Sequence, residues 1–175
     1  MKSLHKVCDY SSMVNPKVEV EDGQKGKILL EYASFNALKP VHVGHLRNIV
    51  LGEAVSRLLQ SQGNEVFRVT YSSDIGLPSA KVIWGINKLE ADYKKVKKAS
   101  LKEKMDFLGK AYVEGSTAYE ENKPIKDEID IINKKIYQRD KKFVSLWQEI
   151  LGWTFEYFNT VYEMVGTKFD AEFLE

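Results

Sequence analysis

The stretch from Ile28 to Gly63 constrains the fold of this chain more than any other part of the sequence. Ile28–Tyr32 is apolar and favours a β-strand, whereas the segment 34–40 is polar and contains a proline, so it cannot continue that strand. Apolar residues then recur every three or four positions, which is the spacing of a helix with one buried face, and Gly63 stands where such a helix commonly ends. The stretch therefore predicts a strand, a tight loop and a helix.

A second strand is expected at Glu65–Tyr71, because Val66, Phe67 and Val69 are interspersed with polar residues. A strand, a helix and a strand within so short a span predict a right-handed βαβ unit with parallel strands. The predicted buried face of the helix is made of its apolar residues: Val43, Leu46, Ile49, Val50, Ala54, Val55, Leu58 and Leu59.

The segment Ser72–Asp74 resembles a helix N-cap and predicts a helix that runs to about Ile86. Three amphipathic helices follow, and their expected boundaries are marked by a stop at Gly115, a start at Pro124 and a stop at Gly166. The aromatic stripe on the last of them has helical spacing, which favours core packing over a base-stacking surface: Trp147, Trp153, Tyr157 and Phe158. Residues 168–174 predict a further strand.

These elements predict an α/β fold: a partial Rossmann-like parallel sheet with a helical insertion. The expected division is an N-terminal segment with a short hairpin at 1–27, a βαβ core at 28–90, a helical insertion at 91–166 and the start of the next strand at 167–175. So few parallel strands suggest a fold that is cut off partway, because open parallel sheets normally have more.

Composition limits the partners and the cellular compartment that can be expected for this chain. Its 175 residues carry a net charge of +1, so any contact with nucleic acid has to be local. The single Cys8, the lack of an apolar run of about 20 residues and the absence of a signal-like N-terminus favour a cytoplasmic protein without a membrane segment. A monomer is expected. Lysines are frequent from Lys88 to Lys104; a solvated face is the expected role, and an RNA backbone contact is the alternative.

Chemistry concentrates at His42-Val43-Gly44-His45, where the predicted helix begins. A helix N-terminus offers unpaired N–H groups and the positive end of its dipole, and it suits a phosphate. His42 and His45 lie on one side of the first turn and both rings can donate hydrogen bonds to phosphate oxygens, while Gly44 lets a flat group approach the backbone. The other readings of the pair are two ordinary surface histidines or a zinc site, but no cysteine or third histidine stands near enough in sequence to complete a zinc site.

Polar residues precede the histidines. Glu31 at the carboxyl end of a parallel strand is expected to face a ligand crevice, where a carboxylate suits a cationic group. Ser34 and Asn36 offer hydrogen bonds to an amino or carboxylate group, and Lys39 is close enough in sequence to reach a phosphate. Each of these four residues also has a purely structural interpretation. Glu31 can be a surface residue at a strand end, Ser34 and Asn36 can be loop formers, and Lys39 can be solvated.

The segment E-Y-A-S-F-N-A-L-K-P-V-H-V-G-H-L-R resembles the signature of class I arginyl-tRNA synthetases, and S-D-I-G and G-T-K-F-D-A-E-F-L-E resemble later parts of that family. The resemblance covers roughly residues 18–175. It implies that arginine and ATP, with Mg²⁺, form arginyl-adenylate and that the arginyl group passes to tRNA(Arg).

By motif position, the resemblance implies ATP binding by Lys39, His42, Gly44 and His45, with the two histidines catalytic. It implies arginine binding by Glu31, Ser34, Asn36 and His45.

The sequence also departs from the family pattern. Phe35 stands where the family usually has proline, and Ser73 stands where glycine often precedes the aspartate. No K-M-S-K-S-like loop occurs, and the domains that contact most of the tRNA are missing, so the expectation is a fragment of the catalytic domain. Two alternatives stay open: a small H-x-G-H nucleotidyltransferase, and a non-catalytic synthetase-like module that binds RNA or a partner protein.

Overall fold

A computed structural model describes residues 26–175 of the chain. The segment expected to pair with the first strand in an N-terminal hairpin lies outside the described residues. Among residues 26–175, none of the helices combines the length and the apolar character that crossing a membrane requires.

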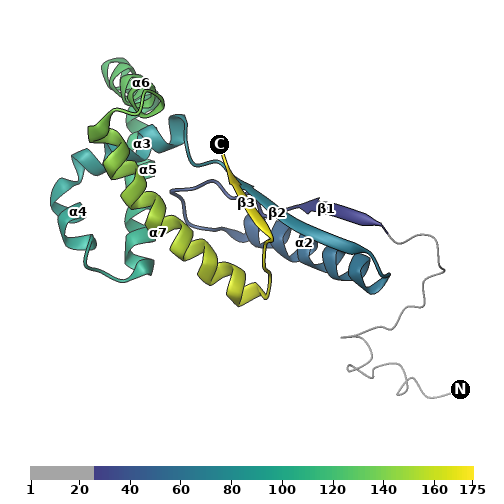
Figure 1. The fold of residues 1–175 in the computed structure, drawn as a ribbon. Coiled ribbons are helices and arrows are strands. Elements are labelled where there is room, and N and C mark those ends of the chain that lie inside the picture. Colours follow the sequence, from purple (N-terminus) through teal and green to yellow (C-terminus); the bar gives the residue numbers. More distant parts are fainter. Residues whose placement is uncertain (1–25) are drawn as a thin grey trace, which may run out of the picture.

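Three parallel strands form one sheet, in the order β1–β2–β3 (Figure 1). Their bounds are Lys27–Glu31 for β1, Glu65–Ser72 for β2 and Ala171–Leu174 for β3. In the register, Ile28 pairs with Val66, and Val69 pairs with Ala171. The parallel βαβ unit and the third strand are both confirmed.

Six helices complete the described part of the chain. They are α2 (Val43–Ser61), α3 (Leu77–Lys88), α4 (Glu90–Val96), α5 (Leu101–Glu121), α6 (Lys123–Tyr137) and α7 (Lys141–Val165). Gly63 follows α2 with a φ of 85°, and Gly166 ends α7 with a φ of 70°, a conformation that glycine adopts without strain. Both predicted helix ends are confirmed, as is Pro124 in the first turn of α6.

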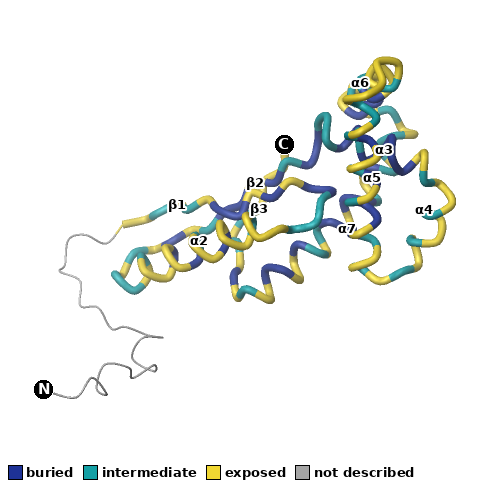
Figure 2. The backbone as a smooth tube through the Cα atoms, turned by 180° about the vertical axis from the view of Figure 1, so that it is seen from behind, coloured by how far each residue is buried: buried dark blue, intermediate teal, exposed yellow. Residues whose placement is uncertain are grey.

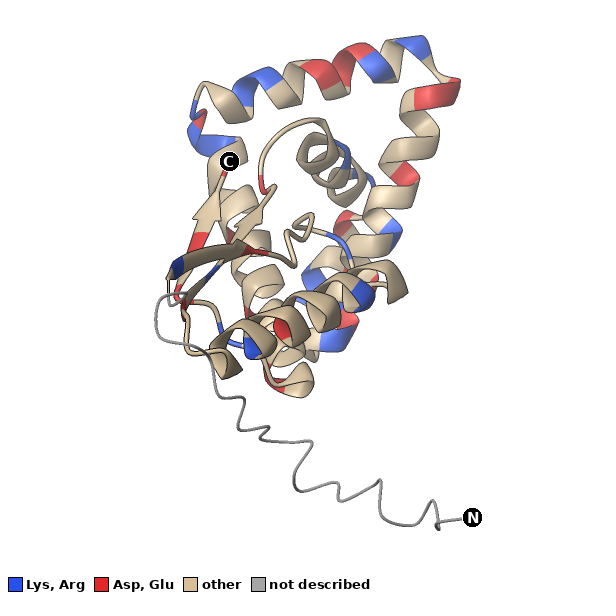
Figure 3. Cartoon of the chain, turned by 90° about the vertical axis from the view of Figure 1, so that its right-hand side faces the viewer, with Lys and Arg blue, Asp and Glu red and all other residues tan. Residues whose placement is uncertain are grey.

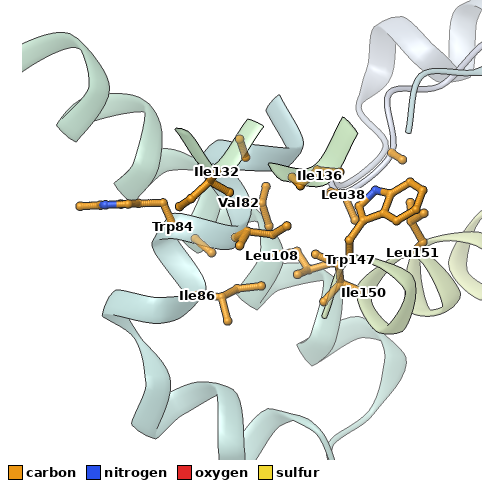
Figure 4. Packing of buried hydrophobic residues seen from close by; sticks show 14 of the residues in the cluster. Leu38, Val82, Trp84, Ile86, Leu108, Ile132, Ile136, Trp147, Ile150 and Leu151 are labelled. Carbon is orange, nitrogen blue, oxygen red and sulfur yellow. The ribbon is translucent and has the colours of Figure 1, made fainter. Parts of the chain in front are cut away.

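Helices α3 to α7 gather at one end of the molecule, and α7 runs from there back to the sheet (Figure 1). Their shared core contains Val82 of α3, Leu108 of α5, Ile132 of α6 and Trp147 of α7 (Figure 4). The tryptophans of the aromatic stripe and Phe158 are buried, and Tyr157 is half-buried, which confirms their role in packing. The helix α3, expected beside the βαβ core, packs mainly against α5 and α6.

The predicted helix stop at Gly115 is wrong, because α5 continues to Glu121. Gly115 lies where α5 crosses α3, and a Cβ added to it would stand 2.1 Å from the carbonyl oxygen of Lys81. Gly85 of α3 is equally close to Ala111 of α5. These glycines allow two helix backbones to approach each other; they do not end a helix.

The predicted N-cap at Ser72–Asp74 is also wrong. The cap position of α3 is Gly76, which has a φ of 107° and makes no side-chain cap hydrogen bond. Asp74 is buried two residues earlier, and its backbone carbonyl accepts hydrogen bonds from Ser79 Oγ and Trp147 Nε1, each at 2.8 Å. This segment therefore anchors α3 and α7 to the end of β2.

The predicted buried face of α2 is wrong for most of its residues. Val43 is 82% exposed, and Val50 and Leu58 are more than half exposed, whereas Ile49 is buried as predicted. Figure 2 shows that much of α2 is exposed, with shorter buried stretches between. The remaining buried positions are polar: Glu53 and Ser56. Only a narrow stripe of α2 faces the sheet, and no other element within residues 26–175 covers the apolar stripe beside it.

The sheet face opposite α2 is also exposed. Leu29 and Phe67 are paired neighbours on β1 and β2, and Tyr71 and Phe173 are paired neighbours on β2 and β3. All four are large apolar residues that are exposed in the described structure. Parallel sheets are normally covered on both faces, so this face has the composition of an interior surface.

Candidate active site at the start of helix α2

The first turn of α2 is capped by the two histidines. His42 occupies the N-cap position, and its Nδ1 accepts a hydrogen bond from the backbone N–H of Gly44 at 3.1 Å. His45 is the third residue of the helix, and its Nδ1 accepts from the backbone N–H of His42 at 3.3 Å. The pair forms a reciprocal capping box, with imidazoles in the place of the usual Ser or Thr and Glu or Gln.

This arrangement sets the tautomer of both rings in their neutral form. A nitrogen that accepts a hydrogen bond carries no proton, so each neutral imidazole holds its proton on Nε2. The rings of His42 and His45 are stacked with centroids 3.7 Å apart, and neither is buried in the core. Burial lowers the pKa of His45, and the neighbouring charges of His42 and Lys39 lower it further. The site therefore offers two Nε2–H donors beside the helix N-terminus, where an anion is favoured.

The loop after β1 contains two consecutive left-handed residues, Ala33 with a φ of 70° and Ser34 with a φ of 47°. Such conformations are unfavourable outside glycine and persist only where surrounding contacts hold them. Thr70 Oγ1 accepts from the N–H of Ser34 at 3.1 Å, and Asn48 Oδ1 accepts from the N–H of Ala33 at 3.4 Å. The Ser34 hydroxyl donates to Glu31 at 3.2 Å, so these two predicted site residues are neighbours.

A groove of about 430 Å³ lies between the end of β1 and the start of α2. Glu31 and Gly44 both line it, which brings a predicted arginine-binding residue and a predicted ATP-binding residue to one surface. Arg47 and Asn48 also line the groove, and sequence reasoning assigned neither of them a role. Their position one turn after Gly44 was the available signal, because residues three or four apart share a helix face.

The other two predicted site residues lie on either side of this region. Asn36 is exposed and forms a β-bridge with Ser73, so it stands at the carboxyl end of the sheet. The ammonium group of Lys39 lies over the ring of Tyr112 on α5, 4.0 Å from its centroid. The nearby Lys39 ammonium is the main cause of a lowered pKa of the Tyr112 hydroxyl. Lys39 thus joins the loop before α2 to the helical cluster.

The lysine-rich stretch runs from the end of α3 through α4 to the start of α5, and basic and acidic residues are interspersed along it. Figure 3 shows basic and acidic segments next to one another on the helices. Lys94 pairs with Glu90, Lys97 pairs with Glu149 at 2.8 Å, and Lys95 pairs with an aspartate on its own helix. These ion pairs support the solvated-face interpretation. Within residues 26–175, no three His, Cys, Asp or Glu side chains are grouped so that they could hold a metal ion.

Comparison with known proteins gives a consistent result. Residues 10–171 match the family model described as tRNA synthetases class I (R), catalytic domain. The arginine–tRNA ligase of Borreliella afzelii is 33% identical over 149 residues, which cover 85% of this chain and 25% of that protein. The arginine–tRNA ligase of Pyrococcus abyssi is 40% identical over 121 residues, which cover 65% of this chain and 19% of that protein.

Solved structures agree with the sequence matches. Arginyl-tRNA synthetase from Thermus thermophilus superposes with a TM-score of 0.62 at 28% identity, covering 87% of this chain and 24% of that one. The enzyme from Plasmodium falciparum shares the fold, with a TM-score of 0.61 at 21% identity over 88% of this chain and 25% of that one. The chain spans about a quarter of the length of the first relatives it matches. The parallel sheet, the histidine-capped helix and these matches together place the chain in the class I arginyl-tRNA synthetase catalytic-domain family.

Proposed function

We propose that this chain supplies the ATP and arginine sites of an arginine–tRNA ligase. In the first step, a carboxylate oxygen of arginine attacks the α-phosphorus of ATP, and the bond to the β-phosphate oxygen breaks. The products are arginyl-adenylate and pyrophosphate. In the second step, a terminal ribose hydroxyl of tRNA(Arg) attacks the arginyl carbonyl carbon and releases AMP.

The observation that carries this proposal is the pair of Nε2–H donors at the start of α2. Because both Nδ1 atoms accept hydrogen bonds from backbone N–H groups, the Nε2–H groups of His42 and His45 are the remaining donors. Negative charge builds on the phosphate oxygens as the α-phosphorus is attacked, and fixed donors stabilise that charge without reorganising. Gly44 leaves the ring of His42 in its place, since a Cβ there would stand only 3.0 Å from that ring and would crowd it.

Arginine binding is assigned to the other side of the same region. The exposed carboxylate of Glu31 suits the cationic guanidinium, and Ser34 holds that carboxylate by a hydrogen bond. Asn36 offers a donor and an acceptor to the α-amino or carboxylate group of the substrate. Lys39 stands close to the histidines in sequence and is proposed to assist the phosphates once it leaves Tyr112.

Mg²⁺ is expected to enter as the ATP complex and to neutralise phosphate charge. The proposal places the chain in the cytoplasm as a monomer, with the segment 28–90 as the core of the site and the segment 91–166 as an insertion beside it. Most contacts with tRNA(Arg) are assigned to parts of the relatives beyond the quarter that this chain matches.

Arginine-dependent ATP–pyrophosphate exchange tests the proposal. It is measured on this chain, and on this chain joined to the part of the Borreliella afzelii ligase that follows the matched region. Exchange by either protein supports the proposal, and the lack of exchange by both contradicts it.

A matched pair of variants then tests how much the two histidines contribute to the exchange rate. The double variant H42S/H45Q has a standard capping box, so it is expected to keep the stability of α2 while losing both Nε2–H donors. It should lose at least about 100-fold in exchange rate, as expected for transition-state donors. V43A alters an exposed side chain between them and should leave exchange unchanged.

A further inference from the structure

The loop that carries Ser34 and Asn36 also contains Phe35, whose side chain is fully buried. Its two neighbours in sequence are exposed, so the loop alternates outward polar residues with one inward aromatic residue. The left-handed conformation of Ser34, held by Thr70, sets this alternation.

Phe35 contacts His45 directly. The two ring centroids are 5.0 Å apart with an interplanar angle of 50°, which is within the range of favourable aromatic pairs. His42 covers another side of the His45 ring at 3.7 Å. The His45 imidazole is therefore held between a buried aromatic ring and its partner histidine.

On its other side, Phe35 packs against helix α7. Its centroid lies 5.0 Å from that of Phe158 in an edge-on arrangement and 5.7 Å from that of Tyr162. Both α7 residues are buried in the same cluster as Phe35. A continuous set of aromatic contacts thus runs from the long helix of the insertion to the histidine pair.

We infer that Phe35 is a positioning residue for the histidine pair, which it orients through direct contact with the His45 ring. A partly exposed imidazole in the first turn of a helix has several staggered side-chain rotamers available, and packing against a buried ring selects one of them. The chosen rotamer places Nδ1 of His45 on the His42 N–H, so the same contact supports the capping box. Only the expected effect of Phe35 on ATP binding rests on the proposed function. The contact between Phe35 and His45 does not depend on that function.

NMR of the histidine ring protons in the full chain tests the inference, with F35L as the variant and F158L as the control. Both variants shorten a buried aromatic residue of the same cluster, but only Phe35 touches His45. F35L should shift the His45 ring signals and raise the pKa of His45 toward its usual value, because solvent gains access to the ring; His42 and Lys39 are the charged groups around it. F158L should leave both readouts close to those of the native chain.

Titration with ATP and Mg²⁺ forms the second arm. F35L should bind about three- to tenfold more weakly, the range expected from loss of one aromatic contact. Unchanged His45 signals and pKa in folded F35L, or equal changes in F35L and F158L, would overturn the inference. If F35L alters His45 while ATP shifts neither histidine in the native chain, the positioning role is supported and the proposed ATP site fails.

Discussion

The hydroxyl of Tyr32 donates a hydrogen bond of 2.8 Å to the Glu53 carboxylate, and this contact joins the end of β1 to the middle of α2. The same carboxylate accepts from Thr167 Oγ1 at 2.7 Å and from Arg57 Nε at 2.6 Å, and it lies 3.3 Å from Arg68 Nε. One buried glutamate therefore connects β1, α2, β2 and the segment before β3. The network fixes the strand end that carries Glu31.

Removing the Glu53 carboxylate should destabilise the fold strongly. E53A removes the buried carboxylate that Tyr32, Thr167 and Arg68 share, and breaking such a buried pair typically costs about 3 kcal/mol or more. Urea denaturation measures the loss. E163A, at an exposed position on α7, is the control and should change the free energy of unfolding by less than about 0.5 kcal/mol. A loss from E53A no larger than that of E163A would contradict the prediction.

The Glu53 network also predicts a dependence of stability on acid. Burial opposes ionisation, but hydrogen bonds from Arg57, Thr167 and Tyr32 outweigh it and lower the pKa of Glu53 below its usual 4.5. The stabilisation is then fully present above about pH 4.5, the value in the unfolded chain, and is lost as the pH falls through the lower folded pKa. The difference in unfolding free energy between the native chain and E53Q should shrink over that range. A difference that stays constant from pH 6 to pH 3 would contradict this.

Two glycines in helices provide a matched test of packing. A Cβ at Gly115 would stand 2.1 Å from the carbonyl oxygen of Lys81, so G115A should destabilise the chain by about 2 kcal/mol. A Cβ at Gly152 of α7 meets nothing within 4 Å, so G152A should stabilise by about 0.5–1 kcal/mol through helix propensity. Thermal unfolding of both variants is the measurement. If both substitutions changed the stability in the same direction, the close approach of α3 and α5 at Gly115 would be contradicted.

These glycines illustrate which features the sequence can and cannot predict. Gly63 and Gly166 were assigned correctly as helix ends because apolar periodicity stops beside them. Gly115 carries the same local signal, but its role depends on Lys81, which is 34 positions away in the chain and close only after folding. Local patterns therefore predicted the existence of the elements better than their contacts.

The site shows the same division. The strand–loop–helix corner that carries Glu31, Ser34, His42 and His45 could be predicted, since residue type and spacing carry that information, whereas the binding and catalytic roles of these residues stay predictions. The capping role of the histidines was not, because histidine is not a usual capping residue and the two hydrogen bonds depend on ring rotamers. Periodicity also misplaced the buried face of α2, because spacing shows that an apolar stripe exists but not which element covers it.

Protonation of His45 should weaken the helix cap. Burial and the charges of His42 and Lys39 lower the pKa of His45 from its usual 6.5, so the unfolded chain binds this proton more readily than the folded chain. Stability is complete above about pH 6.5 and declines as the pH falls through the lower folded pKa. H45Q, which keeps an acceptor at the third helix position, should lack this decline. Parallel unfolding curves for the native chain and H45Q between pH 8 and pH 5 would contradict the prediction.

A final experiment compares an exposed and a buried apolar residue of α2, to test whether stability depends on burial and not on the apolar spacing alone. Leu58 is 56% exposed, so L58Q should change the free energy of unfolding by less than about 0.5 kcal/mol. Ile49 is fully buried between the sheet and α7, so I49A should cost about 3 kcal/mol through lost packing and the cavity left behind. Both positions belong to the apolar pattern that predicts a buried face, and urea denaturation compares them directly. Equal losses at the two positions would mean that another part of the protein covers the outer stripe of α2, whereas the expected inequality agrees with the exposure of that stripe within residues 26–175.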